Sequence, residues 1–477
     1  MPDNNLSAGT HAAAPVPHHV AAAARSINIA EVISEAEIGR TQILVLTVCA
    51  LVAILDGFDL QAIAFTGPVI AQQWRIEATA LGVIFSAALV GMTFGAVLIG
   101  MLGDHFGRKV AVGLSVATFG VFTLATASAD SYNELLVYRF LTGLGVGGAI
   151  PSVTTLTAEY APARLRVRMI AVMSIGIPLG GVFGGLLAAQ MIPAWGWESV
   201  FYAGGVLPLL LLPLVGKVLP ESLHFLVTKR GEESTTTVAQ ILNRIDPSGR
   251  YTESDSFLVP EIRMRGLLVK HLFGSGLARN TLLLWLAFFI NLLALFFLMT
   301  WLPSILVDAG FLISKAINVS VLFSLGGALG ALLLAQLMSQ YGSRQMLTVF
   351  FSLAAFLCAV VVRLVGSSPS FLMLVIFLSG FLTISAQIGM NATAAGIYPT
   401  DIRATGVGWA LGIARVGAIT GPVIGGVLAS LGLDIQGYFL IFGLLLIVAA
   451  IAIALLQFDD KPAMQPGGKP VNVIGEA

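Results

Sequence analysis

Two carboxylic acids lie near the middle of an apolar run that extends from Ile43 to Ile70. Asp56 and Asp59 belong to the stretch ILDGFDLQ, and on a helix they lie about one turn apart on the same face. The run is long enough to cross a bilayer, where an ionised acid is costly. Each acid therefore lines a watery cavity, pairs with a cation or takes up a proton, unless one of them only caps a helix break at Gly57. The first three outcomes suit a protein that moves protons or anions.

Two basic residues also fall inside predicted spans, where a guanidinium stays protonated and needs an anion. Arg415 lies about 15 Å into its span at the helical rise of ~1.5 Å per residue, close to the depth of Asp56. Its anion is either the carboxylate of a substrate, held by two parallel hydrogen bonds, or a carboxylate of the protein in a permanent ion pair. Arg139 lies near the outer end of its span, and it either extends to the surface or couples to Asp59.

Uncharged polar side chains at membrane depth are further candidates, because each needs a hydrogen-bond partner. Asn291 belongs to one predicted span, and Gln387 and Asn391 belong to another. A ring hydroxyl or a carboxylate of a ligand would satisfy them as well as a neighbouring helix. Aromatic residues from Trp285 to Trp301 either face lipid and neighbouring helices or stack on an aromatic ring in a cavity.

The composition places these residues in a polytopic membrane protein. Of the 477 residues, 57% are hydrophobic and only 10% are charged, which is too little polar surface for a soluble domain. The net charge is zero and no basic run follows the pattern of nucleic-acid binding, so no nucleic-acid partner is expected. No metal or cofactor is expected either, because the two cysteines, Cys49 and Cys358, lie far apart inside predicted spans and the histidines of the N-terminal tail lack ligand partners.

Hydrophobic windows separated by turn and charge signals predict twelve transmembrane helices. They cover residues 43–70, 79–102, 110–128, 134–158, 168–190, 199–218, 280–307, 315–338, 345–364, 370–396, 405–430 and 437–457. Twenty Lys and Arg residues fall on the side of the termini and three on the opposite side, which predicts that both termini are cytoplasmic. We therefore expect a multi-pass protein of the cell inner (plasma) membrane.

One long hydrophilic insert divides the spans into six and six. The expected organisation is a cytoplasmic N-terminal tail (1–40), an N-terminal six-helix half (41–218), a central cytoplasmic loop (219–278), a C-terminal six-helix half (279–457) and a cytoplasmic C-terminal tail (458–477). Within the first tail, the isoleucines between Ile27 and Ile38 predict a short surface helix.

The two halves carry related motifs. The segment GMLGDHFGRK, which starts at Gly100, corresponds to AQLMSQYGSR, which starts at Ala335. Glycines from Gly176 to Gly185 recur between Gly417 and Gly426 at a spacing that permits close helix packing, with a hinge as the alternative interpretation. Two parallel repeats predict a pseudo-twofold axis along the membrane normal and a substrate site between the halves.

These motifs resemble the major facilitator superfamily, and the resemblance extends from Arg40 to Gln457. The loop GMLGDHFGRK is similar to the signature between helices 2 and 3, with His105 where Arg or Lys is usual. The run RFLTGLGVGG from Arg139 resembles the helix 4 motif, and Pro220-Glu221-Ser222 resembles the end of helix 6 in sugar and organic-acid branches. The DGFD stretch and the run YPTDIRATGVGWALGIAR, which ends at Arg415, resemble the aromatic acid:proton symporters, whose members take up 4-hydroxybenzoate, benzoate and related acids.

The resemblance implies an all-α major facilitator fold and functional roles at matching positions. The expected proton-coupling residues are Asp56, Asp59 and Glu159, and the expected gating residues are Gly103, Asp104, Gly107, Arg108 and Arg403. The expected substrate-binding residues are Asp59, Arg139 and Arg415, to which the membrane depth of the amides adds Asn291, Gln387 and Asn391. The corresponding loop of the second half has Ser339 and Gln340 where acidic residues are usual, which argues against a gate built on two acidic loops.

The sequence therefore predicts a monomeric symporter that imports a small aromatic carboxylate with protons by alternating access. An anion that enters against an inside-negative potential is opposed by ~2.3 kcal/mol per 100 mV, so at least one proton must accompany it. The alternatives are a symporter of another organic anion or a polyol, or a transporter-like nutrient sensor that signals through the insert or the tail. An enzyme is not expected, because no nucleophile with a base and no His/Cys/Asp cluster lies at membrane depth.

Overall fold

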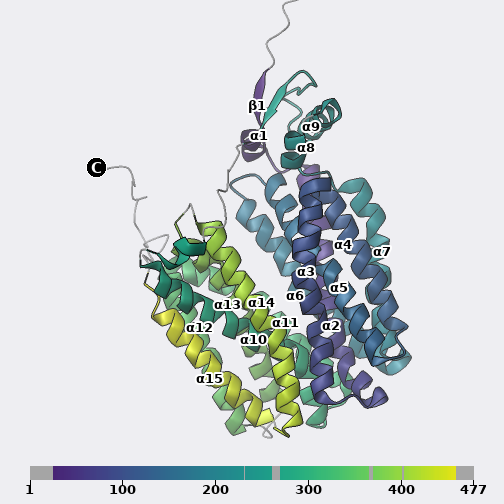
Figure 1. The fold of residues 1–477 in the computed structure, drawn as a ribbon, viewed down its shortest axis with the longest axis vertical. Coiled ribbons are helices and arrows are strands. Elements are labelled where there is room, and N and C mark those ends of the chain that lie inside the picture. The colour runs from purple at the N-terminus through teal and green to yellow at the C-terminus, as the bar shows by residue number, and fades with distance from the viewer. Residues whose placement is uncertain are drawn as a thin grey trace, which may run out of the picture.

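The structure, a computed structural model, describes residues 25–229, 231–259, 269–274, 276–364, 369–399, 402–433 and 435–457. Twelve helices of these residues are long and apolar enough to cross a membrane, as predicted. The first six are α2 (Arg40–Trp74), α3 (Ala78–Phe106), α4 (Arg108–Ala127), α5 (Tyr132–Tyr160), α6 (Arg166–Trp195) and α7 (Glu198–Val218). The second six are α10 (Leu277–Asp308), α11 (Ile313–Tyr341), α12 (Ser343–Leu364), α13 (Pro369–Ile397), α14 (Arg403–Ser430) and α15 (Ile435–Ala454). Figure 1 shows these two sets of helices as halves that lie side by side. Together with the twelve spanning helices, this arrangement confirms the predicted fold class.

Glycine brings the first and fifth helices of each half into contact. A Cβ atom at Gly180 would lie 1.9 Å from the carbonyl oxygen of Ile54, so the backbones of α2 and α6 touch. In the second half, a Cβ at Gly417 would lie 2.2 Å from the carbonyl oxygen of Phe289, and α10 touches α14 in the same way. The glycine spacing read from the sequence therefore serves helix packing.

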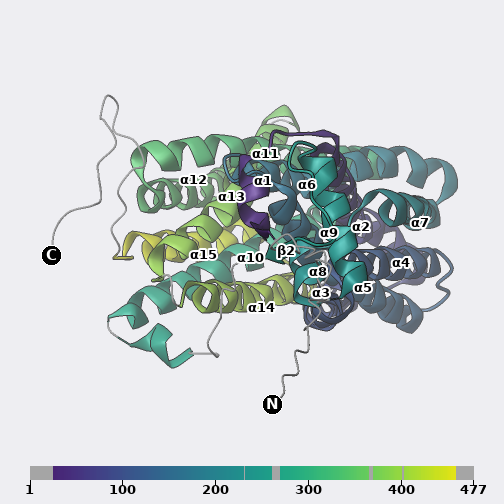
Figure 2. The same ribbon diagram turned by 90° about the horizontal axis from the view of Figure 1, so that it is seen from above.

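The insert carries short elements of its own at one end of the bundle. They are α8 (Leu223–Lys229), α9 (Glu232–Ile245), β2 (Ser256–Leu258) and the 3₁₀ helix η1 (Val269–Phe273). Figure 2 shows α8 and α9 lying over the N-terminal half. We call this end of the bundle the insert end and the opposite one the far end.

The chain before α2 folds onto the insert. Strand β1 (Ser26–Asn28) pairs in parallel with β2, and α1 (Ile29–Glu35) follows it directly. Ile29 and Ile33 are buried in one apolar cluster with residues of the insert and of α2, α4 and α5. The predicted surface helix is therefore confined to α1, and β1 and α1 pack onto the insert.

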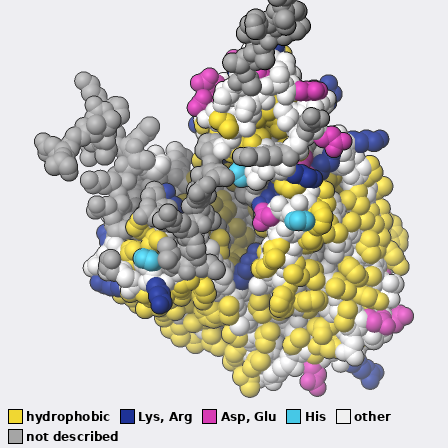
Figure 3. All heavy atoms as spheres, turned by 45° about the horizontal axis from the view of Figure 1, so that its top comes forward, with side chains coloured by type: hydrophobic (Ala, Val, Ile, Leu, Met, Phe, Trp, Pro, Cys, Tyr) yellow, Lys and Arg dark blue, Asp and Glu magenta, His cyan; other side chains and the backbone are white. Residues whose placement is uncertain are grey.

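The two halves meet at the far end and separate toward the insert end. Near the far end, the hydroxyl of Ser86 on α3 donates to the carbonyl oxygen of Ile419 on α14 at 2.7 Å. On the same face of α14, closer to the insert end, a Cβ at Gly412 or Gly408 would meet no other atom within 4 Å. Figure 3 shows the surface hollowed between the halves at the insert end. The structure is thus closed at the far end and open at the insert end.

Candidate functional site

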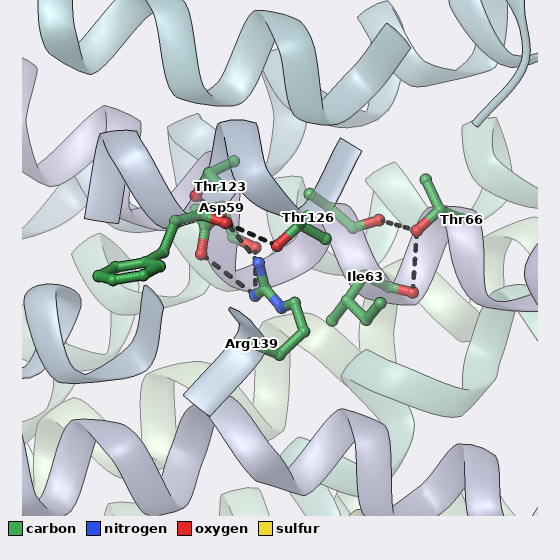
Figure 4. A network of polar contacts seen from close by, with 8 residues as sticks. Asp59, Ile63, Thr66, Thr123, Thr126 and Arg139 are labelled. Atoms are coloured by element: carbon green, nitrogen blue, oxygen red, sulfur yellow. Dashed lines mark hydrogen bonds and ion pairs between the residues drawn. The ribbon is translucent and has the colours of Figure 1, made fainter. Parts of the chain in front are cut away.

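Asp59 of α2 and Arg139 of α5 form an ion pair inside the N-terminal half (Figure 4). Nη1 of Arg139 lies 3.1 Å from Oδ1 of Asp59, and Nη2 donates to Oδ2 at 3.1 Å and to the Asp59 carbonyl oxygen at 3.3 Å. Thr123 of α4 donates its hydroxyl to the same carboxylate at 2.7 Å. The guanidinium carbon lies 5.7 Å from the ring centre of Phe201 on α7. Four helices, α2, α4, α5 and α7, therefore fix the carboxylate and the cation that it binds.

The pair is sealed from solvent in this conformation. Arg139 is 0% exposed and Asp59 is 1% exposed. The side chain of Arg139 therefore does not extend to the surface but pairs with Asp59, and a functional coupling of the two residues stays a prediction. Because the pair lies among α2, α4, α5 and α7, all of one half, neither residue lines the opening between the halves here. The structure does not bring this pair together with the other predicted substrate-binding residues.

Asp56 has a different environment from Asp59. It is 2% exposed, and its Oδ1 has no hydrogen-bond partner within the part of the chain that the structure describes. Phe58 packs inside the N-terminal half against glycines of α6 and α7. At about 100° per residue, Asp56 lies nearly opposite Phe58 on α2, on the face that it shares with Asp59. A buried carboxylate without a partner is unfavourable when ionised, so a proton or a cation bound at Asp56 would be stabilising.

Arg415 of α14 links the two halves. Its Nη1 donates to the carbonyl oxygen of Met92 on α3 at 3.1 Å. Among the described residues no carboxylate forms an ion pair with it, so the permanent ion pair considered from the sequence is not present there. Along α14 it lies between the contact at Ile419 and the open position at Gly412. A guanidinium has five N–H donors, and one neutral acceptor leaves most of them for a carboxylate that arrives from the opening.

The three predicted amides come together in the C-terminal half. Asn291 of α10 donates to Oε1 of Gln387 on α13 at 2.9 Å, and Gln387 donates to Oδ1 of Asn391 at 3.3 Å. Asn291 is fully buried, whereas Asn391 is exposed. Oδ1 of Asn291 has no partner among the described side chains and backbone. The amides therefore form a chain of hydrogen bonds from the interior of this half to its surface, with one acceptor unused.

Glu159 lies at the insert end of α5, and the structure does not bring it to the aspartates. Twenty positions separate it from Arg139 on one helix, which is about 30 Å along the axis. Its Oε1 accepts a hydrogen bond from Ser222 at 2.9 Å, and its Oε2 is buried without a partner in the described chain. Glu159 thus fixes the segment that leaves α7, and any part in proton transfer would be separate from the ion pair.

The predicted gating loop turns α3 into α4. Gly107 has φ of +106°, a backbone conformation that favours glycine, and a Cβ there would displace the carboxylate of Glu221, whose Oε2 would lie 2.2 Å away. The carbonyl oxygen of Gly103 accepts the N–H of Gly107. Asp104 pairs with Arg108 within the loop, and its side chain is 69% exposed.

Arg403 lies at the start of α14, in the other half. Its Nε donates to the carbonyl oxygen of Tyr398 at 3.3 Å. In the described ranges, no hydrogen bond or ion pair joins it to Asp104. These two predicted gating residues are therefore not in contact while the insert end is open.

Sequence reasoning missed two groups of contacts. Ser324 of α11 donates to Oε1 of Gln61 on α2 at 3.1 Å, which joins the two halves. Glu221 accepts the backbone N–H of Lys109 at the start of α4, and its carbonyl oxygen accepts the hydroxyl of Tyr160 at 2.6 Å. Two features of the sequence could have indicated these contacts. They are the amide of Gln61, which follows the two aspartates on the same helix, and the carboxylate of Glu221 in the Pro-Glu-Ser motif.

A metal site is not found in the residues that the structure describes, where no three His, Cys, Asp or Glu side chains form a suitable group. Cys49 and Cys358 are both buried and free. Each packs as a small apolar residue, as the sequence suggests.

A family model and several known proteins match most of this chain. A family model described as Major Facilitator Superfamily matches residues 49–362 and 284–471. The chain is 39% identical over 428 residues to a gallate transporter of Pseudomonas putida, covering 90% of this chain and 94% of that protein. It is 38% identical over 431 residues to the 4-hydroxybenzoate transporter PcaK of Acinetobacter baylyi, covering 90% and 93%.

Solved structures resemble the fold at low sequence identity. A crystal structure of a D-xylose-proton symporter has a TM-score of 0.68 at 16% identity, with 88% of this chain and 99% of that chain covered. An inward open structure of the Escherichia coli xylose transporter XylE also has a TM-score of 0.68 at 16% identity, over 86% and 95%. These two similarities concern the fold alone.

Proposed function

Because the chain belongs to the major facilitator superfamily, and is a transporter and not an enzyme, we propose that it imports a small aromatic carboxylate together with a proton. Proteins of 37–39% identity are named as transporters of gallate and 4-hydroxybenzoate, which supports an aromatic acid as the substrate. The excess of basic residues on the side of the termini supports a cytoplasmic insert end. In that orientation the conformation described above is open to the cytoplasm.

The observation that carries proton coupling is the contrast between the two aspartates of α2. Asp59 is compensated by Arg139, with both oxygens bound at 3.1 Å. Asp56 is equally buried and has an oxygen without a partner in the described chain. We therefore assign the transported proton in this conformation to Asp56, while Asp59 remains ionised against Arg139. A proton and a monoanion together carry no net charge, so the membrane potential does not oppose their entry.

Arg415 is our candidate for the group that binds the substrate carboxylate. A carboxylate forms an ion pair with a guanidinium through two parallel hydrogen bonds, whereas the Met92 carbonyl oxygen is neutral and accepts one. The carboxylate would thus replace the Met92 carbonyl as the acceptor and release the contact between α3 and α14. Gln387 and Asn391 offer an amide edge toward the surface of the C-terminal half, which suits a ring hydroxyl.

Transport by purified protein in liposomes tests the coupling. We expect Asp56→Asn to lose proton-driven accumulation of 4-hydroxybenzoate while it retains exchange of labelled for unlabelled acid, because the amide mimics the protonated acid. Asp308→Asn, an exposed acid at the far end of α10, is the matched control and should accumulate normally. Full accumulation by Asp56→Asn would contradict the assignment, and loss of both accumulation and exchange would show that Asp56 binds substrate instead.

A further inference from the structure

A groove of about 400 Å³ runs between α3, α5 and α14 near the far end of the bundle. Its walls are apolar and include Val83 and Ala87 of α3, Val137 and Phe140 of α5, and Ile419 and Val423 of α14. Two helices of the N-terminal half and one of the C-terminal half thus enclose it. It is separate from the opening at the insert end and from the ion pair.

The chemistry of the lining determines what can fill this groove. The one hydroxyl among its lining residues belongs to Ser86, which is 4% exposed and already donates to the carbonyl oxygen of Ile419. A water molecule needs two to four polar partners, so water is not stabilised there. At the mouth, Val137 is 51% exposed and Val83 is 40% exposed. All of these residues belong to membrane-spanning segments, so the mouth faces hydrocarbon.

From this geometry we propose that an acyl chain of a membrane lipid occupies the groove. Ser86 lies eight positions into α3 from its far end, about 12 Å along the axis, which places the groove in the leaflet at the far end. Hydrocarbon is the medium that surrounds these helices, and the apolar walls offer a chain more contact than a flat helix surface does.

The acyl chain is also linked to the conformation of the protein, a step that rests on the proposed alternating access. Opening the far end requires α3 and α14 to separate, because Ser86 and Ile419 are in contact there. Separation removes the wall that Ile419 and Val423 provide. The chain therefore binds the state with a closed far end and shifts the population toward it, since a ligand favours the state for which it has higher affinity.

Lipid retention measures the occupancy directly. The full-length protein in detergent is titrated with palmitoyl-oleoyl phosphatidylethanolamine, and bound lipids are counted by native mass spectrometry. Ala87→Phe and Val423→Phe fill the groove from opposite walls, so one of them remains informative if the other fails to fold. Val97→Phe, on α3 at a position that is 59% exposed and outside the groove, is the control. We expect both groove variants to retain one lipid fewer than the wild type and the control, and equal retention overturns the proposal.

Cysteine labelling measures the conformational link. Thr79→Cys places a thiol at the α3–α14 contact of the far end, where Thr79 adjoins Gly426, and the native cysteines are buried. Adding the same lipid to delipidated protein should slow labelling several-fold, and the variant that also carries Ala87→Phe should not respond. Unchanged labelling despite retained lipid overturns the conformational role. Because lipid retention needs no substrate, failure of the proposed transport function would leave that result unaffected.

Discussion

Replacement of Asp59 by Asn should destabilise the protein strongly, because it removes the carboxylate that compensates Arg139 in the described part of the chain. The guanidinium is 0% exposed, so water does not solvate it after the change. Breaking a buried pair by removing one partner costs about 3–5 kcal/mol. The new amide still accepts one hydrogen bond, and the ring of Phe201 still contacts the cation. We therefore expect the lower end of this range, about 3 kcal/mol.

Two further variants remove the cation, first alone and then together with the carboxylate. Arg139→Met alone leaves Asp59 buried without its cation and should also cost about 3–5 kcal/mol. The double variant, Asp59→Asn with Arg139→Met, leaves no buried charge at this position and should recover much of the lost stability. The difference between the double variant and the sum of the single variants measures the coupling of the pair.

Thermal unfolding in detergent is the assay, followed by the loss of monodisperse protein on heating. Asp104→Asn is the matched control, since its pair with Arg108 is largely exposed and exposed pairs contribute about 0–1 kcal/mol. If Asp59→Asn unfolds at the temperature of this control, or if the two single losses add up in the double variant, the pair does not stabilise the N-terminal half as argued.

Three further predictions follow from other sites. Arg415→Lys keeps the charge but loses the planar donor geometry, so it should weaken binding of aromatic acids much more than binding of the matching uncharged amides; equal losses would indicate a structural role. Asp104→Asn should raise the accessibility of cysteines placed at the insert ends of α5 and α13 and slow turnover with a smaller change in substrate affinity; unchanged accessibility with normal uptake would show that the loop is only a connector. In the insert, hydrogen bonds from Ser248 and Tyr251 lower the pKa of Asp246, so its contribution to stability is complete above an ordinary Asp pKa of about 3.9 and disappears as the pH falls through the lower folded value. Asp246→Asn should therefore make the insert more sensitive to proteolysis at neutral pH, and an unchanged cleavage rate would contradict this.

The fold could be predicted from the sequence because the hydrocarbon core of a membrane restricts which backbone structures can cross it. A spanning segment must satisfy its own backbone, so each of the twelve helices appears as a long apolar run. The close contact at Gly180 was accessible for a related reason, since small residues at helical spacing are needed wherever two backbones touch. Apolar runs and glycine spacing can both be read within one segment, without knowing which helix packs against it.

The site was only partly accessible, because its contacts join distant positions. Asp59 and Arg139 are 80 positions apart, and the sequence left open whether the cation reached the surface. The partner of Arg415 is a backbone carbonyl oxygen, which any residue type supplies, so no pattern identified Met92. No pattern predicts the pairing of strands β1 and β2, because they lie about 230 positions apart and have three residues each.

The first and fourth helices of each half are joined by polar side chains, but the two joints differ in kind. In the N-terminal half the joint consists of ions, Asp59 and Arg139. In the C-terminal half it consists of the amides Asn291 and Gln387, which neither gain nor lose a proton near neutral pH. If the halves descend from one duplicated ancestor, the duplication allowed their chemistry to diverge while their architecture was kept. Under the proposed coupling, a proton acts on the N-terminal repeat at Asp56, beside the ionic joint, while the amide joint of the C-terminal repeat keeps the same charge. The proton gradient therefore acts directly on only one of two similar halves.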